Sequence, residues 1–331
     1  MNITEKKPSG KLIVGVGSAL VDILAHEEDE FLKRTGATKG GMILVDKEFI
    51  EAVVKETSRK PKIVTGGSAC NTAVGVGQLG GQARFVGKCG NGKWARLFRE
   101  DLIKQSVEPA LFTSSSPTGR VLSIITPDAQ RSMFTYLGAS SETLPHELSN
   151  GCFDDAAIVH IEGYLLFNPD LILGAVKMAR ASGALISLDL ASFTVVEDAK
   201  DLLDQIIADF VDIVIANEDE ARVFTGLADE MNAVEALSEK VDVAIVKIGE
   251  RGSLIAHDNK VIKIAAMGDG NALDTTGAGD LWASGFLYGL VNDYPLEKCG
   301  EIGSACGYEV CQVVGATIPE RGWKRIKKLL L

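Results

Sequence analysis

Short apolar runs alternate with longer segments of helical periodicity along most of the chain. The runs have apolar residues at almost every position and cover residues 11–18, 83–90, 156–164, 184–192, 211–220 and 241–250. Such runs are typical of strands buried on both faces. Between them the pattern predicts helices, for example over residues 168–182, 197–209 and 217–226. We therefore predict an α/β fold with a mostly parallel central sheet and helices on both of its faces.

Two segments interrupt this alternation and predict a second, smaller layer. Residues 20–46 and 118–138 carry shorter runs of alternating hydrophobicity, with a turn signal at Pro127-Asp128. This pattern is typical of antiparallel strands outside the main sheet. We expect the two segments to form a small β-rich lid, joined to the rest through the polar stretch 112–119. The large α/β domain is then predicted to comprise residues 1–19, 47–117 and 139–331.

Composition and charge narrow the classes of partner. The 331 residues are 46% hydrophobic and 24% charged, which is typical of a globular protein. The net charge of −11 argues against nucleic acid or a membrane as a partner, because binding to phosphates requires clustered Lys and Arg. The six cysteines contain no C-x-x-C pair and the four histidines are scattered, which argues against zinc. The first ten residues lack the apolar core of a leader, so we expect a cytoplasmic protein.

Three glycine-rich motifs match nucleotide-binding patterns in the wrong context. The segment 87–94 has P-loop spacing, but Trp94 stands where a Ser or Thr hydroxyl should bind magnesium. The segment 75–80 fits G-x-G-x-x-G but follows a predicted helix start instead of a strand. The segment 15–20 follows a strand but ends in Leu20. We therefore reject both a P-loop and a dinucleotide-binding fold.

The stretch NALDTTGAGDLWASGFLYGL at residues 271–290 predicts an anion site. Three small residues, Gly277, Ala278 and Gly279, come directly before Asp280 and a run that reads as a helix. Glycine allows a ligand to approach the backbone closely, and the first turn of a helix offers unpaired amides. A carboxylate would then lie beside a bound anion. The alternative is that Asp280 only caps the helix.

A second stretch, VTGGSACNTAVGVGQLGG at residues 64–81, predicts a site for hydroxyl groups. The pair Gly66-Gly67 permits close approach of a ligand to the backbone. Asn71 follows one turn into a predicted helix and carries an amide that both donates and accepts hydrogen bonds. The alternative is a helix start with a buried polar cap.

Together these two stretches resemble the paired signatures of the ribokinase-like (PfkB) carbohydrate and nucleoside kinases. GGSACN and DTTGAGDLWASGF occur in the order and spacing of that family, and the resemblance covers residues 11–319. Further segments resemble its adenosine kinase branch: VGSALVDI, FLKRTGATKGGMILVDKE, TGR, EGYLLFNPD, LDLASF and VDIVIANEDEA. The resemblance implies transfer of the γ-phosphoryl group of ATP to the 5′-hydroxyl of a nucleoside, with adenosine as the expected acceptor. A kinase of the same family acting on a free sugar or sugar phosphate is the alternative.

The resemblance also implies roles for individual residues near the reacting groups. Asp280 would accept the proton of the attacking hydroxyl, and the backbone amides of Gly277, Ala278 and Gly279 would stabilise the transferring phosphoryl group. Arg131, on a predicted lid strand, would bring a positive charge over the phosphates, unless it is an ordinary surface arginine.

A set of residues is implied to bind the acceptor. Asp22 would hold sugar hydroxyls together with Gly66, Gly67 and Asn71, and the ring of Tyr164 would stack on the base. A solvated turn residue at Asp22 and an ordinary strand-end aromatic at Tyr164 are the alternatives. Positions near this pocket differ from animal-type adenosine kinases at Ser18, Met42 and Met133.

On the nucleotide side the resemblance implies a third set of residues. Asn217 and Glu220 form the N-x-x-E of the family and would orient water bound to Mg²⁺. Lys247, Gly249 and Gly252 match the strand and turn beside the nucleotide.

The same resemblance implies ions and partners. Asp274 and Thr276, with the loop 313–317, match positions where some relatives bind a monovalent cation such as K⁺. The expected partners are ATP and a small-molecule acceptor, and the protein is expected to be a monomer or a homodimer.

Overall fold

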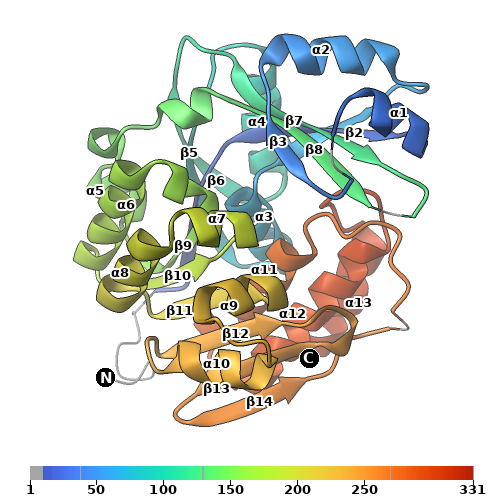
Figure 1. Cartoon of the computed structure of the whole chain (residues 1–331). Helices are drawn as coiled ribbons and strands as arrows, with labels where there is room; N and C mark the ends of the chain where they lie inside the picture. The colour runs from blue at the N-terminus through green and yellow to red at the C-terminus, as the bar shows by residue number, and fades with distance from the viewer. Residues whose placement is uncertain (1–9, 38, 129, 269, 331) are drawn as a thin grey trace.

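A nine-stranded sheet forms the centre of the large layer (Figure 1). The computed structural model describes residues 10–37, 39–128, 130–268 and 270–330. Its strand order is β14-β13-β12-β11-β10-β9-β1-β5-β6. The expectation about a leader falls on residues 1–10, of which 1–9 lie outside the described residues.

The predicted buried runs all form strands of this sheet. From β6 across to β12 neighbouring strands run parallel, and β13 and β14 continue the sheet as antiparallel strands. The strands are β1 (Leu12–Val16), β5 (Gln82–Cys89), β6 (Val107–Thr113), β9 (Ala156–Glu162), β10 (Leu185–Asp189), β11 (Ile213–Asn217), β12 (Val243–Lys247), β13 (Ser253–His257) and β14 (Lys260–Ile264). The mostly parallel sheet predicted from hydrophobic runs is therefore confirmed.

Helices cover both faces of the large sheet, because its strands are apolar on both sides. One face packs against α5 (Asn150–Phe153), α6 (Pro169–Ala181), α7 (Phe193–Asp198), α8 (Lys200–Phe210), α9 (Glu218–Thr225) and α10 (Glu230–Ser238). The other face packs against α3 (Ser68–Leu79), α4 (Lys93–Lys104), α11 (Ala278–Val291) and α12 (Leu296–Cys311), and α13 (Glu320–Lys327) lies beyond them. None of the described helices is both long and apolar enough to cross a membrane.

A five-stranded sheet forms the smaller layer, in the order β3-β8-β7-β2-β4. Its outer face carries α1 (Asp29–Arg34) and α2 (Lys47–Glu56). The strands are β2 (Leu20–His26), β3 (Met42–Leu44), β4 (Lys62–Gly66), β7 (Thr118–Ile125) and β8 (Arg131–Gly138).

Two features of the small sheet differ from the sequence prediction. The expected antiparallel pairing holds for β7 with β8, but it is wrong for β2 with β7 and for β3 with β8, which are parallel. In addition, β4 pairs with β2, and Ile50 and Val53 of α2 pack into the core of this sheet. Residues 47–66 were predicted to belong to the large domain, yet the hydrogen bonds of β4 place it in the small sheet.

Close helix packing brings the two glycine-rich stretches together. Gly75 of α3 lies against α11, and a Cβ atom built on it would come within 2.3 Å of the Ser284 hydroxyl oxygen. Gly285 of α11 is equally close to α12, since its Cβ would lie 2.7 Å from the Ile302 carbonyl oxygen. The small residues after Asp280 therefore let α11 pack tightly on both neighbours, which places its first turn beside the first turn of α3.

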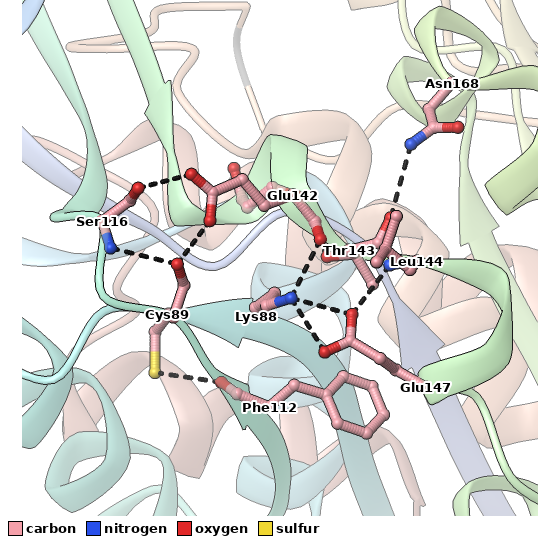
Figure 2. A network of polar contacts seen from close by, with 11 residues as sticks. Lys88, Cys89, Phe112, Ser116, Glu142, Thr143, Leu144, Glu147 and Asn168 are labelled. Atoms are coloured by element: carbon pink, nitrogen blue, oxygen red, sulfur yellow. Dashed lines mark hydrogen bonds and ion pairs between the residues drawn. The ribbon is translucent and has the colours of Figure 1, made fainter.

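A polar network joins the segments that connect the two sheets (Figure 2). The Lys88 ammonium at the end of β5 donates to both carboxylate oxygens of Glu147, at 2.8 and 2.9 Å, and to the Glu142 carbonyl oxygen, at 2.9 Å. The Glu142 carboxylate accepts hydrogen bonds from Ser114 and Ser116, in the linker between β6 and β7. The chain enters β7 and leaves β8 at this network.

Candidate active site

A cavity of about 500 Å³ lies between the carboxyl ends of the large sheet and the inner face of the small sheet. Most residues predicted to act in catalysis or binding line it. They are Asp22, Gly67, Asn71, Arg131, Tyr164, Asn217, Glu220, Lys247, Gly277, Ala278, Gly279 and Asp280. These residues come from both sheets and from distant parts of the chain.

The register of the parallel strands aligns polar side chains at one edge of the sheet. Glu162 of β9 is paired with Asp189 of β10, and Asn217 of β11 with Lys247 of β12. Successive side chains alternate between the faces of a strand, so paired residues share a face. The face is the one covered by α3 and α11, since Ile158, four residues before Glu162 and therefore on the same face, packs in that core. The strand ends therefore direct their polar groups toward the two helix starts.

Asp280 lies three residues into α11 and is held there by α3. The N-cap residue is Gly277, and no side chain caps the helix, so the alternative that Asp280 is a cap is wrong. Its carboxylate accepts hydrogen bonds at 2.8 Å from the Ser68 hydroxyl and at 2.8 Å from the Asn71 amide. Burial raises its pKa, the Asn71 bond opposes that rise, and the charge of Asp189 adds to it. The alternative of a buried polar cap at the start of α3 is also wrong, because the N-cap residue there is Gly67 and no side chain caps the helix.

The small-residue turn before Asp280 presents its backbone to the cavity. Gly277 has a φ of +74°, a conformation that glycine adopts without strain. The Ala278 N–H donates to the Thr275 carbonyl oxygen at 3.1 Å, so it is already engaged, in contrast to the expected phosphate contact. Gly279 lies beneath the Lys247 ammonium, which would be 2.9 Å from a Cβ atom at that position. The positive charge of Lys247 therefore lies beside the first turn of α11.

Asp22 lies in β2 and is 7% exposed, so the alternative of a solvated turn residue is wrong. Burial raises its pKa to about 6, and the charge of Arg131 on β8 acts in the opposite direction. Gly66 does not line the cavity but packs against Asp22, because a Cβ atom there would lie 2.4 Å from the Asp22 carboxyl carbon. Gly66 thus makes room for the carboxylate.

Apolar and aromatic side chains also line the cavity. Tyr164 lies in a short 3₁₀ helix, Gly163–Phe167, which follows β9, and its hydroxyl donates to the Ala191 carbonyl oxygen at 3.4 Å. Leu44 and Phe167 also line the cavity and remain 58% and 51% exposed. The three positions that differ from animal-type adenosine kinases also line the cavity: Ser18, Met42 and Met133.

Asn217 and Glu220 form a reciprocal cap at the start of α9. The Glu220 N–H donates to the Asn217 side chain at 2.9 Å, and the Asn217 N–H and amide donate to the Glu220 carboxylate at 2.8 and 2.7 Å. Burial, together with the charge of Asp189, raises the pKa of Glu220 to about 7. Both residues therefore serve the local fold as well as facing the cavity.

Lys247 and Asp189 form a buried ion pair at 3.0 Å, with side chains 15% and 8% exposed. Although burial opposes ionisation of both groups, the attraction between them raises the pKa of Lys247 and lowers that of Asp189. The Lys247 ammonium is therefore charged at the place where ATP and the acceptor are predicted to meet.

A second cavity of about 290 Å³ adjoins the first and contains the remaining nucleotide-side residues. Gly249 and Gly252 line it, and it shares Lys247, Thr275, Ala278 and Gly279 with the first cavity. Gly252 has a φ of +99°, and a Cβ atom there would lie 1.9 Å from the Ile264 carbonyl oxygen, so only glycine fits.

Asp274 and Thr276 are buried beside the loop 313–317. One oxygen of Asp274 accepts hydrogen bonds from the Thr276 N–H and hydroxyl, at 2.9 and 2.6 Å. The other oxygen accepts from the Gly315 N–H at 2.8 Å. The segment that carries Asp274 and Thr276 therefore contacts the loop 313–317, as predicted. Groups of the chain itself donate hydrogen bonds to both Asp274 carboxylate oxygens.

Three residues of the site have no role among the sequence predictions. Ser68 lies in the GGSACN motif, where its hydroxyl gave a signal that was not used. Glu162 accepts hydrogen bonds from the backbone of Ser18 and Ala69 at 2.8 and 3.0 Å, and burial raises its pKa to about 7. Asp189 follows a buried run, as Glu162 does, so an acidic residue at the end of each run was the available signal.

Comparison with known proteins agrees with this geometry. The family model described as pfkB family carbohydrate kinase matches residues 20–321. The chain is 25% identical to adenosine kinase 2 of Arabidopsis thaliana, over 94% of this chain and 96% of that protein. It superposes on the crystal structure of adenosine kinase from Sinorhizobium meliloti with a TM-score of 0.89 and 30% identity, covering 97% and 99% of the two chains.

A second solved structure is equally similar but carries a different description. It is a probable sugar kinase protein from Rhizobium etli CFN 42, with a TM-score of 0.90, 31% identity, and coverage of 97% and 98%. The matches thus agree on fold and reaction class and differ on the acceptor. The chain belongs to the pfkB family of carbohydrate kinases and is an ATP-dependent phosphotransferase.

Proposed function

We propose that this chain transfers the γ-phosphoryl group of ATP to the 5′-hydroxyl of a nucleoside, with adenosine as the preferred acceptor. The observation that carries the proposal is a single cavity lined by both charged and apolar side chains. Asp280, Lys247 and the turn 277–279 line it, and so do Tyr164, Leu44 and Phe167. The charged groups suit a phosphate, and the apolar and aromatic side chains suit a base.

The proposed reaction is an in-line transfer. The acceptor oxygen bonds to the γ-phosphorus, the bond from that phosphorus to the bridging oxygen breaks, and ADP leaves with the electron pair. Asp280 accepts the proton of the acceptor hydroxyl. The Lys247 ammonium and the backbone N–H groups of Gly277 and Gly279 stabilise the negative charge of the transferring group. Asp22 and Asn71 hold the sugar hydroxyls.

The residues present fit a magnesium ion bound mainly through phosphate and water. Within the described ranges, no group of three or more His, Cys, Asp or Glu is arranged to hold a metal ion. Both Glu220 oxygens already accept hydrogen bonds from Asn217. Because Mg²⁺ commonly keeps several waters, we propose that these two residues orient water bound to the ion. When bound, Mg²⁺ offsets charge on the phosphates.

Two further roles belong to the same proposal. The small sheet would act as a lid and carry Arg131 of β8, which lines the cavity, toward the phosphates. A monovalent cation would bind beside Asp274, where the loops 273–277 and 313–317 meet. Activity that stays flat across a titration of K⁺ would remove the cation from the proposal.

The test is ADP release from Mg-ATP with adenosine, inosine, guanosine, cytidine, ribose, fructose and fructose 6-phosphate as acceptors. Preferential turnover of adenosine is expected. Turnover of sugars alone would leave the kinase chemistry in place and replace the nucleoside by a sugar. Absence of turnover with every nucleoside would contradict the proposal.

Asp280→Asn tests the proposed base. We expect kcat to fall by roughly 10²–10⁴, the usual contribution of a general base, with ATP affinity retained. Asp201→Asn, at an exposed position on α8, is the matched control and should keep wild-type kcat. Undiminished turnover by Asp280→Asn would show that another group accepts the proton.

A further inference from the structure

The Asp280 carboxylate has a donor on each of its oxygens. Ser68, the first residue of α3, donates from its hydroxyl to Oδ1 at 2.8 Å, and the Asn71 amide donates to Oδ2 at 2.8 Å. Both donors come from α3, one helical turn apart, and both line the cavity. Thr72 contacts the same residue differently, because its hydroxyl donates to the Asp280 backbone carbonyl oxygen at 3.1 Å.

The two donors differ in what a bound acceptor would do to them. In the proposed function the sugar hydroxyls bind next to Asp22, and the Asn71 amide can both donate and accept, so an acceptor would compete for that amide. Ser68 has one hydroxyl hydrogen, which is directed at Asp280. Release of Oδ2 by Asn71 would leave a lone pair available for the proton of the 5′-hydroxyl, while Oδ1 stays held.

We propose that Ser68 is a positioning residue that holds the Asp280 carboxylate by Oδ1, and that the acceptor frees Oδ2 for proton transfer by engaging Asn71. This inference rests on the proposed function, because it assigns Asp280 as the base. The proton moves from the acceptor hydroxyl to Oδ2 as the oxygen–phosphorus bond forms and the bond to ADP breaks. Ser68 forms no bond to the reacting atoms, so its effect passes through Asp280.

Other charged groups surround Asp280, and the test must separate them from Ser68. Asp22 on β2, Glu162 on β9 and Asp189 on β10 are acidic, and Lys247 on β12 is the nearby cation. Glu220 on α9 and Arg131 on β8 face the same cavity. A Ser68 substitution leaves all of these in place, so a change in pH dependence between matched Ser68 variants reports the lost hydroxyl.

The experiment compares Ser68→Ala, Ser68→Thr and Thr72→Val with the wild type. A hydrogen bond donated to a carboxylate stabilises its charged form, so loss of the Ser68 hydroxyl should raise the pKa of Asp280. We expect the acidic limb of the kcat profile of Ser68→Ala to move up by about one pH unit. Its kcat at pH 7 should fall about tenfold. Ser68→Thr keeps a hydroxyl and should restore the limb, and Thr72→Val should leave it at the wild-type position.

The KM values provide a second readout. A positioning role predicts a lower kcat with the KM of the acceptor changed less than threefold, whereas a direct contact between Ser68 and the acceptor predicts a raised KM. An unmoved acidic limb in Ser68→Ala, or a loss confined to KM, would overturn the inference. Asp280→Asn is measured beside it: if Asp280→Asn is inactive and Ser68→Ala behaves as wild type, only this inference fails. If Asp280→Asn is fully active, the proposed base fails first.

Discussion

The Lys88 network offers a test of how the connections between the two sheets are stabilised. The perturbation is Lys88→Met, which keeps an apolar stem of similar length and removes the ammonium. The side chains of Lys88 and Glu147 are 8% and 21% exposed. After the substitution Glu147 retains the hydrogen bond from the Leu144 N–H, at 2.8 Å, and the Glu142 carbonyl loses its contact with the ammonium.

The size of the effect follows from burial. Removing one partner of a buried ion pair costs about 3–5 kcal/mol, because the other charge is left without compensation. Glu147 is one-fifth exposed and keeps one donor, so we expect the low end, about 3 kcal/mol. A chain of 331 residues has an unfolding entropy near 0.7 kcal/mol/K, so Tm should fall by about 4 °C.

Thermal and urea unfolding followed by circular dichroism measure this loss. Lys104→Met, at an exposed position near the end of α4, is the control and should change the free energy of unfolding by less than about 0.5 kcal/mol. Adding Glu147→Gln to Lys88→Met removes the uncompensated charge and should recover about 2 kcal/mol of the loss. A loss below about 1 kcal/mol, or no recovery in the double variant, would show that the Lys88–Glu147 ion pair does not stabilise these connections.

Two further predictions concern the cavity. Tyr164→Ala should lower kcat/KM for the best nucleoside about tenfold through lost stacking. Tyr164→Phe should have little effect, because the hydrogen bond from the hydroxyl to the Ala191 carbonyl is long, at 3.4 Å; an unchanged kcat/KM in Tyr164→Ala would count against a base at this position. The pKa of Asp22 rises from 3.8 to about 6 on folding, so the folded state binds the proton more tightly and its stability decreases as pH rises through this window. The free energy of unfolding of Asp22→Asn relative to the wild type, measured with urea, should therefore increase by roughly 2–3 kcal/mol from pH 4 to pH 8. A pH-independent difference would contradict the raised pKa of Asp22.

Much of the site could be predicted, because its parts lie at the ends of recognisable elements. Tyr164, Asn217 and Lys247 lie at or near the ends of predicted buried runs, and parallel strands bring such ends to one edge. Ser68 and Glu162 were missed for different reasons. A serine beside glycines is typical of many helix starts, and nothing local indicates that its hydroxyl reaches Asp280, 212 positions away. The sequence shows only that Glu162 is a polar residue at the end of a strand. Its role follows from the hydrogen bonds that the backbone of Ser18 and Ala69 donates to its carboxylate, and these residues are distant in the chain.

The alternation of strands and helices, the mostly parallel sheet and the two glycine-rich turns follow from the amino-acid sequence, because they depend on the burial pattern and backbone freedom of neighbouring residues. Contacts between segments far apart in the chain set which strands pair in the small sheet, including β4 with β2, and which donors contact Asp280. Hydrophobic periodicity shows which face of a helix or strand is buried, but not which element packs against that face. Packing between distant segments selects this element: Gly75 leaves space for Ser284, which brings the starts of α3 and α11 together.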